Sequence, residues 1–367
     1  MQFEVSKQVL LKAIASVNGV VEKKNTIPVL QNIKIEVKDD NVILSATDMD
    51  ILITTSFACD MKTAGTTTVL AQMFFDIVRK IPEGASIIIT QDNPNILQIK
   101  SGKSKYNLPC ILAEEFPNIA EGELGEEFVI NSAKLIEMID KTRFAISNDE
   151  TRYYLNGLFL QGLKRDSGFE LRCIATDGHR LALSFMEANL NTPFGVIIPK
   201  KSVAEIRRVV DGAEEVKISV SRIKIKVVSS QATLVSKLID GEFPDYEKVL
   251  PKNNSRIAVI NKKEFFEALD RVSTVATDKH RSIKLLLENG KMNLQVSTND
   301  GSFAFEELEV NYLEEKIEAG FNSRYLMDVV GQVVGDEVLM RFRDGNSPAL
   351  VEAKRMNSVF VIMPVRI

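Results

Sequence analysis

Apolar and polar residues follow a pattern that occurs three times along the chain. In each copy a short apolar strand leads into an amphipathic helix, a turn with glycine, and a second apolar strand. The copies span residues 68–89, 196–220 and 317–342. Their turn glycines, Gly84, Gly212 and Gly335, are 128 and 123 residues apart, close to a third of the 367-residue chain. This spacing predicts three similar domains.

Other markers recur at the same spacing. A second amphipathic helix begins after Ser6, at Ser132 and after Asn261, residues that can cap a helix. A Thr-Asp pair occurs at residues 47–48 and 176–177, more loosely at 298–300, and a Phe-Pro pair at 116–117 and 243–244. The alternative is that similar helix and strand boundaries arise by chance in an α+β chain, but four markers that recur in one order argue against it. We predict an α+β fold of three domains, each with two helices on antiparallel sheets. Their predicted ranges are 1–122, 125–250 and 253–367.

Composition narrows the functional classes. Lys and Arg number 46, Asp and Glu number 50, and the net charge is −4. A protein that coats nucleic acid through bulk positive charge is therefore excluded, although a local basic patch is not. Two histidines and three cysteines, without CxxC or HxxxH spacing, argue against a zinc site. Sparse cysteines, no apparent signal peptide and no apolar run near ~18 residues predict a soluble cytoplasmic protein.

No catalytic constellation can be identified. Residues 101–104, SGKS, resemble the end of a phosphate-binding loop, but that loop requires glycine where Leu97 stands. Cys173, Asp177 and His179 fall in one strand-turn unit, yet Cys173 has the context of a small strand residue. We predict that His179 is a structural turn residue. The sequence therefore favours a non-enzymatic protein without a metal or cofactor.

Positive charge is enriched on the predicted helices. Six helical windows carry a net charge of +6, and the rest of the chain carries −10. The windows are residues 6–18, 72–80, 132–143, 200–211, 261–272 and 322–330. A solvated helical face is one explanation, since the last two windows contribute nothing. The other is a ring lined by helices. With helices about 10 Å apart, six would leave a hole of about 9 Å and twelve a hole of about 28 Å, wide enough for duplex DNA.

Four stretches resemble the bacterial DNA sliding clamp family, the beta subunit of the replicative DNA polymerase. They are RYYLNG at 152–157, ATDGHRLA at 175–182, SKLIDGEFPDY at 236–246 and VIMPVRI at 361–367. The resemblance extends from Phe3 to Ile367. It implies that three DNA-clamp domains form half of a closed ring, which closes as a head-to-tail homodimer around duplex DNA without sequence preference. It also implies a processivity factor without catalytic activity.

Partner binding is a further implication of the resemblance. In that family the replicative polymerase, the ATP-driven clamp loader, repair polymerases and mismatch-repair proteins insert short linear peptides into a pocket between the second and third domains. The matching positions are Arg152, Leu155, Thr176, Gly178, His179, Arg180, Leu181, Pro244, Lys248, Val249, Val361, Met363, Pro364, Val365, Arg366 and Ile367. Apolar side chains suit the floor, and Arg152 and Arg180 suit a rim that donates to peptide carbonyls. The alternative for the C-terminal tail is a closing edge strand.

The resemblance also assigns DNA contacts. The matching positions are Lys24, Arg79, Tyr153, Tyr154, Lys200 and Lys201. The two tyrosines can stack on exposed bases, and strand packing is their alternative. Lys24 and Lys248 stand where a well-known relative has arginine, which retains the charge but loses planar hydrogen bonding.

The ring joint is expected between the first domain of one chain and the third domain of another. Tyr106 and Leu108 match its apolar contacts on one side, and Thr274 and Val275 match the other. Thr274 replaces a larger aliphatic residue, which weakens the expected joint. Lys103 and Lys105 facing Glu306 and Glu307 would add exposed ion pairs of ~0–1 kcal/mol each. Two other functions stay open: a monomeric peptide-binding scaffold and, less favoured, an enzyme that acts on nucleic acid.

Overall fold

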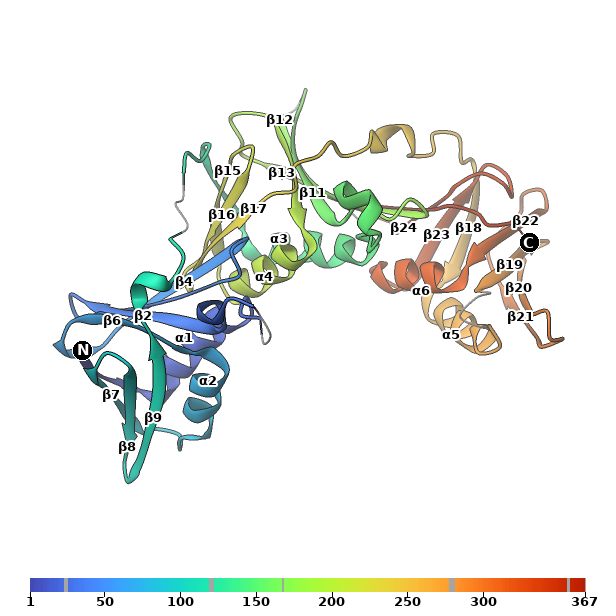
Figure 1. Ribbon diagram of the computed structural model, residues 1–367. Helices are drawn as coiled ribbons and strands as arrows, with labels where there is room; N and C mark the ends of the chain where they lie inside the picture. The colour runs from blue at the N-terminus through green and yellow to red at the C-terminus, as the bar shows by residue number, and fades with distance from the viewer. Residues whose placement is uncertain (23–25, 119–121, 167, 277–280, 355–356, 367) are drawn as a thin grey trace. The chain divides into compact units, whose positions relative to one another are not determined.

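The computed structural model describes residues 1–22, 26–118, 122–166, 168–276, 281–354 and 357–366. They form two compact units (Figure 1). The first unit consists of Met1–Ile136 and Ile198–Ile239, and the second of Glu137–Ile197 and Asp240–Ile367. Among the described residues, no helix combines the length and the apolar character needed to cross a membrane.

Amphipathic helices form where the apolar periodicity predicts them. The described α-helices are α1 (Lys7–Asn18), α2 (Ala71–Lys80), α3 (Ser132–Thr142), α4 (Lys200–Val210), α5 (Lys262–Ser273) and α6 (Ser323–Gln332). In α1 the buried side chains include Leu10, Ile14 and Val17, a spacing of three to four residues that gives one apolar face. α1 contacts α2 in the first unit, and α5 contacts α6 in the second (Figure 1).

Antiparallel sheets make up the rest of both units. A 13-stranded sheet has the order β10-β15-β16-β17-β4-β3-β2-β6-β9-β8-β7-β1-β5. Its strands are β1 (Gln2–Ser6), β2 (Asn32–Lys38), β3 (Asn41–Thr47), β4 (Ile51–Ala58), β5 (Asp60–Thr63), β6 (Gly65–Leu70), β7 (Ser86–Asn93), β8 (Ile96–Ser101), β9 (Ser104–Ile111), β10 (Glu127–Asn131), β15 (Glu215–Val220), β16 (Lys224–Val228) and β17 (Thr233–Lys237). This sheet belongs to the first unit.

The second unit contains two further sheets. An eight-stranded sheet has the order β14-β11-β12-β13-β25-β24-β23-β18, and a four-stranded sheet the order β21-β20-β19-β22. The strands are β11 (Gly157–Arg165), β12 (Gly168–Thr176), β13 (Arg180–Ala188), β14 (Phe194–Pro199), β18 (Arg256–Asn261), β19 (Ser282–Glu288), β20 (Lys291–Ser297), β21 (Phe303–Glu309), β22 (Ile317–Asn322), β23 (Glu337–Phe342), β24 (Ala349–Glu352) and β25 (Ser358–Ile362).

The same set of contacts, called here the clasp, joins the two helix-containing segments in each of the three repeats. The strand before the first helix pairs antiparallel with the strand after the second helix: β1 with β7, β10 with β15, and β18 with β23. The first helical N–H also donates to a carbonyl in the turn after the second helix. These bonds run from Lys7 to Ala85 (2.9 Å), Ser132 to Glu214 (3.0 Å) and Lys262 to Asp336 (2.8 Å). The turn glycines Gly84, Gly212 and Gly335 all have positive φ, as glycine allows. The predicted triplication is confirmed.

The Thr-Asp markers are three copies of one turn. In each, the threonine hydroxyl donates to the carbonyl four residues later. The pairs are Thr47 with Ile51 (2.8 Å), Thr176 with Arg180 (2.7 Å) and Thr298 with Ser302 (3.3 Å). Asp48 and Asp177 each accept two backbone N–H groups of their own turn, as in Asx turns, and Asp300, one position further from its threonine, accepts one. These turns begin β4, β13 and β21.

The middle repeat is shared between the two units because its strands join both neighbouring repeats. In the first unit β17 pairs with β4, with Ser236 opposite Ile51. In the second unit β13 pairs with β25, with Arg180 opposite Ile362. The compact units therefore do not follow the repeats. The domain ranges predicted above remain a prediction.

The Thr47 turn offers a test of this local geometry. Met49 has a φ of 80°, a left-handed conformation that costs a residue with a Cβ roughly 1–2 kcal/mol, whereas Gly178 takes the positive φ in the second turn. We expect Met49→Gly to stabilise the protein by about 0.5–1 kcal/mol after the entropy cost of glycine, seen as a higher Tm in calorimetry. The control Ser56→Gly, within β4, should lower Tm; if both substitutions lower it, the turn is not strained.

Candidate functional site

A small apolar pocket lies in the second unit. Its cavity volume is about 130 Å³. Ten residues line it: Leu155, Thr176, Gly178, Arg180, Leu181, Pro244, Tyr246, Val249, Val361 and Met363. Nine of these were expected at a peptide-binding site from the sequence, and Tyr246 was not. The residues come from segments up to 208 positions apart, so the fold brings nine of the sixteen predicted residues together.

The pocket floor is built by a strand pairing. Leu181 on β13 lies directly opposite Val361 on β25, and both side chains are buried. Leu155, at the end of the 3-10 helix Glu150–Leu155, is buried beside them. Beyond β25, the N–H of Met363 donates to the carbonyl of His179 at 2.8 Å and keeps Met363 at the pocket wall. β25 has β13 and β24 as neighbours, so the alternative of a closing edge strand is wrong.

Arg180 ties the pocket wall to the rest of the second unit. Its Nε donates to Asp177 Oδ2 at 3.1 Å, Nη1 to Asp328 Oδ2 at 2.5 Å, and Nη2 to the carbonyl of Phe144 at 2.9 Å. The guanidinium also lies 4.3 Å from the ring centroid of Tyr325. Its side chain is only 10% exposed. Arg180 therefore braces the pocket internally with three of its N–H groups, and its expected role as a donor to peptide carbonyls remains a prediction.

Arg152 and Gly178 meet at one side of the pocket. The Arg152 side chain is about one-third exposed, and its Nε donates to Asp149 Oδ2 at 2.9 Å. A Cβ on Gly178 would lie 2.6 Å from Arg152 Nη1, and φ at Gly178 is 88°. The backbone conformation therefore favours glycine here, whereas the flexible end of the Arg152 side chain could move aside for a Cβ.

The remaining predicted pocket residues do not line the cavity. The His179 ring stacks on Tyr325 with centroids 6.2 Å apart, and exposed Lys248 pairs with Asp245 at 2.9 Å. Pro364, Val365 and Arg366 follow Met363, with the N–H of Val365 bonded to the carbonyl of Gly320 at 2.8 Å. Ile367 lies outside the described residues.

Tyr246 is the pocket residue that sequence reasoning missed. Its ring is buried, and its hydroxyl donates to Gln161 Oε1 at 2.6 Å and accepts from Arg172 Nη1 at 2.7 Å. Burial raises the pKa of Tyr246 above its usual value, so the hydroxyl stays protonated. One sequence feature could have indicated Tyr246. It lies two residues after Pro244, and an aromatic ring with a polar end suits a partly buried loop.

Cys173 and His179 do not form a nucleophilic pair. Cys173 is fully buried within β12, and burial raises its thiol pKa to about 12. His179 is exposed in the turn that follows β12. Cys173 is therefore a core residue, as its sequence context predicts. Within the described ranges, no cluster of three or more His, Cys, Asp or Glu side chains could hold a metal ion.

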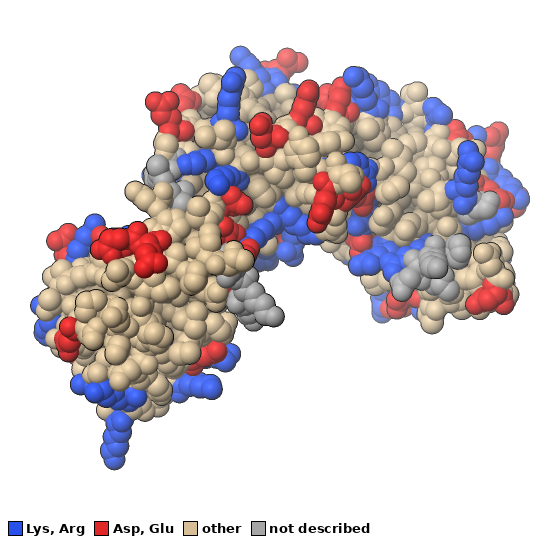
Figure 2. All heavy atoms as spheres, in the orientation of Figure 1, with Lys and Arg blue, Asp and Glu red and all other residues tan. Residues whose placement is uncertain are grey.

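The residues expected to contact DNA lie in both units. In the first, exposed Arg79 pairs with Asp76 at 2.8 Å, and Lys201 pairs with Asp48 at 2.5 Å. Lys200 is exposed at the start of α4, and Figure 2 shows Lys and Arg side chains gathered near that helix. In the second, Tyr153 is largely exposed and packs edge-on against Tyr154, 5.8 Å between centroids. Lys24 lies outside the described residues.

The expected ring-joint residues differ in exposure. Thr274 is exposed, Tyr106 and Val275 are partly buried, and Leu108 is only 3% exposed within its own unit. The two acids expected to pair across the joint already have partners. Glu306 accepts from Arg271 Nε at 3.1 Å, and Glu307 accepts from Lys291 Nζ at 2.6 Å. Any ion pair across a joint would therefore extend an existing network.

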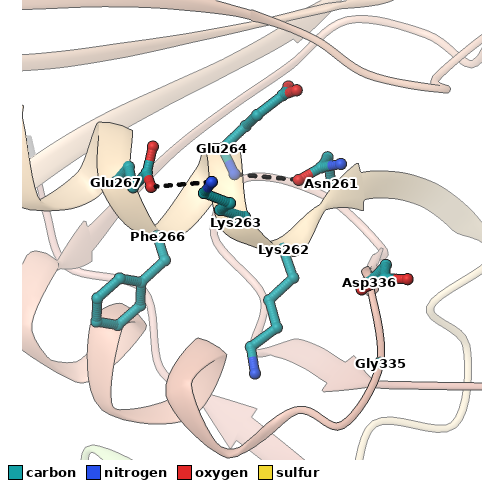
Figure 3. A pocket seen from close by; sticks show the side chains of 8 residues that line it. All are labelled: Asn261, Lys262, Lys263, Glu264, Phe266, Glu267, Gly335 and Asp336. Atoms are coloured by element: carbon teal, nitrogen blue, oxygen red, sulfur yellow. Dashed lines mark hydrogen bonds and ion pairs between the residues drawn. The ribbon is translucent and has the colours of Figure 1, made fainter.

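A larger, polar cavity of about 660 Å³ lies at the start of α5 (Figure 3). It is lined by Asn261, Lys262, Lys263, Glu264, Phe266, Glu267, Gly335 and Asp336. Asn261 Oδ1 accepts from the N–H of Glu264 at 3.1 Å, and Lys262 Nζ donates to the carbonyl of Val333 at 2.5 Å. These polar groups belong to the helix cap and to the clasp of the third repeat, so we assign this cavity no ligand.

Comparison with known proteins identifies the class. Models of the DNA polymerase III beta subunit match the chain with the N-terminal domain at residues 1–120, the central domain at 129–245 and the C-terminal domain at 247–366. The chain therefore belongs to the bacterial beta sliding clamp family, the beta subunit of DNA polymerase III. Three clamp domains of mixed helix and antiparallel sheet agree with this membership.

The similarity to individual relatives covers whole chains. The chain is 42% identical to the beta sliding clamp of Caulobacter vibrioides (strain NA1000 / CB15N) over 374 residues, and 32% identical to that of Escherichia coli (strain K12) over 371 residues, with 100% of each chain covered. Among solved structures, the Bartonella birtlesii sliding clamp bound to griselimycin is 39% identical with a TM-score of 0.96, covering 100% of both chains. The Caulobacter crescentus pol III beta structure is 42% identical with a TM-score of 0.95 and the same coverage.

The bracing by Arg180 can be tested by substitution. We expect Arg180→Lys to destabilise the protein by about 2–4 kcal/mol, because lysine cannot reach the carbonyl of Phe144 and both acids together and leaves buried groups unpaired. Urea unfolding measures the change. Arg152→Lys is the matched control: it alters a partly exposed pair and should cost under about 1 kcal/mol. Equal losses for the two variants would contradict a bracing role.

Proposed function

We propose that this chain is a DNA sliding clamp that confers processivity on the replicative DNA polymerase. It encircles duplex DNA as a head-to-tail homodimer, each chain contributing three clamp domains and half of the ring. It is a non-catalytic accessory subunit that acts in the cytoplasm. The observation that carries the proposal is the match of all three domains of the family over the chain, together with a pocket lined by nine residues at the expected positions.

The proposed contact with DNA is electrostatic and loose. Phosphates attract Lys and Arg regardless of base sequence, which suits a protein that must move along the duplex. Lys200 and Arg79 are exposed on the second helices of the first two repeats, and Tyr153 offers an aromatic face. We propose these residues, with Tyr154, Lys201 and Lys24, as the DNA-facing set. The ring, rather than affinity, would keep the protein on DNA.

The proposed partner site is the small apolar pocket. Pockets for drug-sized ligands usually measure about 300–1,000 Å³, so a cavity of about 130 Å³ suits one or two anchoring side chains. Leu181, Val361 and Met363 offer such a side chain only apolar contacts, since Arg180 is engaged internally. This favours the apolar or aromatic residue of a short linear peptide. Replicative and repair polymerases, the clamp loader and mismatch-repair proteins are the proposed partners.

The DNA topology provides the first test. After loading with a clamp loader and ATP, we expect the protein to stay on closed circular DNA through high-salt washing, because salt weakens phosphate contacts but cannot open a ring. Cutting the circle once should release it. Bound protein is measured by gel filtration. Retention on linear DNA equal to that on circles would contradict encirclement, and a single-chain mass at all concentrations would favour a monomeric peptide-binding scaffold.

The pocket provides a second, independent test. We expect Met363→Glu to weaken binding of a fluorescent pentapeptide rich in Leu and Phe at least tenfold, because a carboxylate would be buried against apolar side chains. Lys164→Ala is the control, since Lys164 is exposed, does not line the cavity and is not among the expected binding residues. Fluorescence anisotropy gives Kd, and the dimer mass should not change. Dissociation into monomers, or equal Kd for both variants, would refute this placement of the site.

A further inference from the structure

One wall of the small apolar pocket comes from a segment with little regular structure. Residues 243–249, called here the pocket loop, contribute Pro244, Tyr246 and Val249 to the cavity lining. The pocket loop belongs to no described strand and contains one 3-10 turn, from Tyr246 to Lys248. Its described backbone hydrogen bonds are local, as from the N–H of Val249 to the carbonyl of Tyr246 at 3.0 Å. Side chains, and not a strand ladder, must therefore fix this wall.

Aromatic rings place the pocket loop against the sheet. Phe243 stacks face to face on Phe159 of β11, with ring centroids 4.7 Å apart and an angle of 3° between the planes. Tyr246 meets the same ring edge-on, with centroids 6.4 Å apart. A Cβ on Gly195 of β14 would lie 2.8 Å from Phe159 Cζ, so the neighbouring strand packs closely on this ring. Apolar packing is non-directional, so these contacts hold the loop on the sheet without fixing where each ring lies.

A buried arginine supplies the directional contacts. Arg172 lies on β12, directly opposite Gln161 of β11, and is only 8% exposed. Its Nη1 donates to the Tyr246 hydroxyl at 2.7 Å and to Glu247 Oε1 at 2.9 Å. Its Nε donates to Glu170 on the same strand. The Tyr246 hydroxyl in turn donates to Gln161 Oε1 at 2.6 Å. Two neighbouring strands therefore hold this one hydroxyl between them.

We propose that Arg172 and Gln161 are positioning residues of the pocket, which fix the Tyr246 ring and, through it, the pocket loop. Neither residue is among those that line the cavity. Hydrogen bonds to a charged group are directional and stronger than those between neutral groups, so they place the ring where apolar packing cannot. This inference rests on the proposed peptide site and names residues that determine its affinity and its selectivity.

Charge pairing also binds the pocket loop to the sheet. Glu170 on β12 and Glu247 on the loop share the guanidinium of Arg172. Glu247 also lies 3.5 Å from Arg165 Nη2 at the end of β11. Moving the loop off the sheet would remove both the hydroxyl and the carboxylate that it brings to a buried guanidinium, which is unfavourable. The network therefore resists displacement of the loop.

This arrangement makes the cavity sensitive to the size of its occupant. With a volume of about 130 Å³, the cavity accommodates one or two side chains, and a bulkier one must push back a wall. If Tyr246 moved, its bonds to Gln161 and Arg172 would break together. Leucine should therefore be preferred to tryptophan as an anchoring side chain, although tryptophan offers more apolar area. The bonds of one hydroxyl thus set selectivity as well as affinity.

Peptide affinity tests the positioning role. We expect Arg172→Gln and Tyr246→Phe each to raise the Kd of the fluorescent pentapeptide rich in Leu and Phe about three- to tenfold, because the ring at position 246 remains but is no longer held. Both substitutions break the same hydrogen bond, so the double variant should bind no more weakly than the weaker single variant. Fluorescence anisotropy gives Kd, and calorimetry establishes that each variant is folded. Tyr246→Phe leaves every charge in place, so it keeps the test decisive if Arg172→Gln does not fold.

A second arginine of the same unit provides the matched control. Arg341 on β23 pairs with Glu352 of β24 at 2.5 Å, and neither residue lines the cavity. Arg341→Gln removes an ion pair of the same kind and should change Kd less than about twofold. A change equal to that of Arg172→Gln would mean that loss of stability alone weakens binding, which would overturn the positioning role.

Selectivity provides a readout that a purely structural role would not change. Two pentapeptides that differ only in carrying tryptophan or leucine at the anchoring position give a ratio of Kd values. In Arg172→Gln we expect this tryptophan-to-leucine ratio to fall about threefold or more, because the loosened wall admits the larger ring. A raised Kd with an unchanged ratio would contradict a wall that selects its occupant by size.

Hydrogen exchange tests the wall without a peptide. In Arg172→Gln we expect the amides of residues 246–250 to exchange about tenfold faster or more, because the loop opens locally. The amides of β25, which contributes Val361 to the pocket, should keep their rates. Mass spectrometry of peptic fragments measures both segments. Equal acceleration in both would show a global loss of stability and count against the positioning role.

The outcomes separate this inference from the proposed function. Failure of the unsubstituted chain to bind any of the peptides overturns the partner site and, with it, the positioning role. Binding by the unsubstituted chain with Kd unchanged in both Arg172→Gln and Tyr246→Phe overturns the positioning role and leaves the partner site standing. Weaker binding, a smaller selectivity ratio and faster exchange confined to the loop support both.

Discussion

The pairing of β13 with β25 is the constraint on which the candidate site depends. It joins Leu181 to Val361, residues 180 positions apart, and no local propensity can enforce such a contact. A slip of β25 by one residue would turn the side chain of Val361 away from Leu181 to the opposite face and remove the pocket floor. The bond between Met363 and His179 and the brace of Arg180 hold the register at its end. Stability and the shape of the candidate pocket therefore depend on the same few contacts.

The same strand pairing occurs at both junctions between repeats within the chain. The pair Leu181–Val361 corresponds to Leu52–Val235 at the junction in the first unit. The same strand-pairing geometry thus occurs at both junctions within the chain, β4 with β17 and β13 with β25, although the side chains at the two junctions differ. At the second, Gly178 and Tyr246 admit a cavity. The strands at each junction belong to a sheet that contains strands of two repeats. Each compact unit therefore includes parts of two repeats, and the middle repeat is divided between the two units.

The sequence predicts what is local and periodic. Helices, turn glycines and the Thr-Asp turns follow from residue type and spacing, so the triplication could be predicted before the structure was known. The nine pocket residues came from family resemblance, because nothing local in Leu155 or Val361 indicates that they meet. The internal engagement of Arg180 was unpredictable for the same reason: its partners Phe144 and Asp328 lie on other elements. Tyr246 was missed because its burial depends on Gln161 and Arg172, far away in sequence.

Charge pairing bears on how such a protein would hold DNA. Lys201 is paired with Asp48 and Glu22, and Arg208 with Glu205 and the end of α1. Cations paired in this way attract phosphates less than free ones do, since part of their field is cancelled nearby. Strong binding would impede movement along the duplex, so weak attraction with a closed ring is the combination that permits both retention and sliding. The acidic net charge of the chain is then compatible with the proposed function on DNA, because closure of the proposed ring would replace affinity.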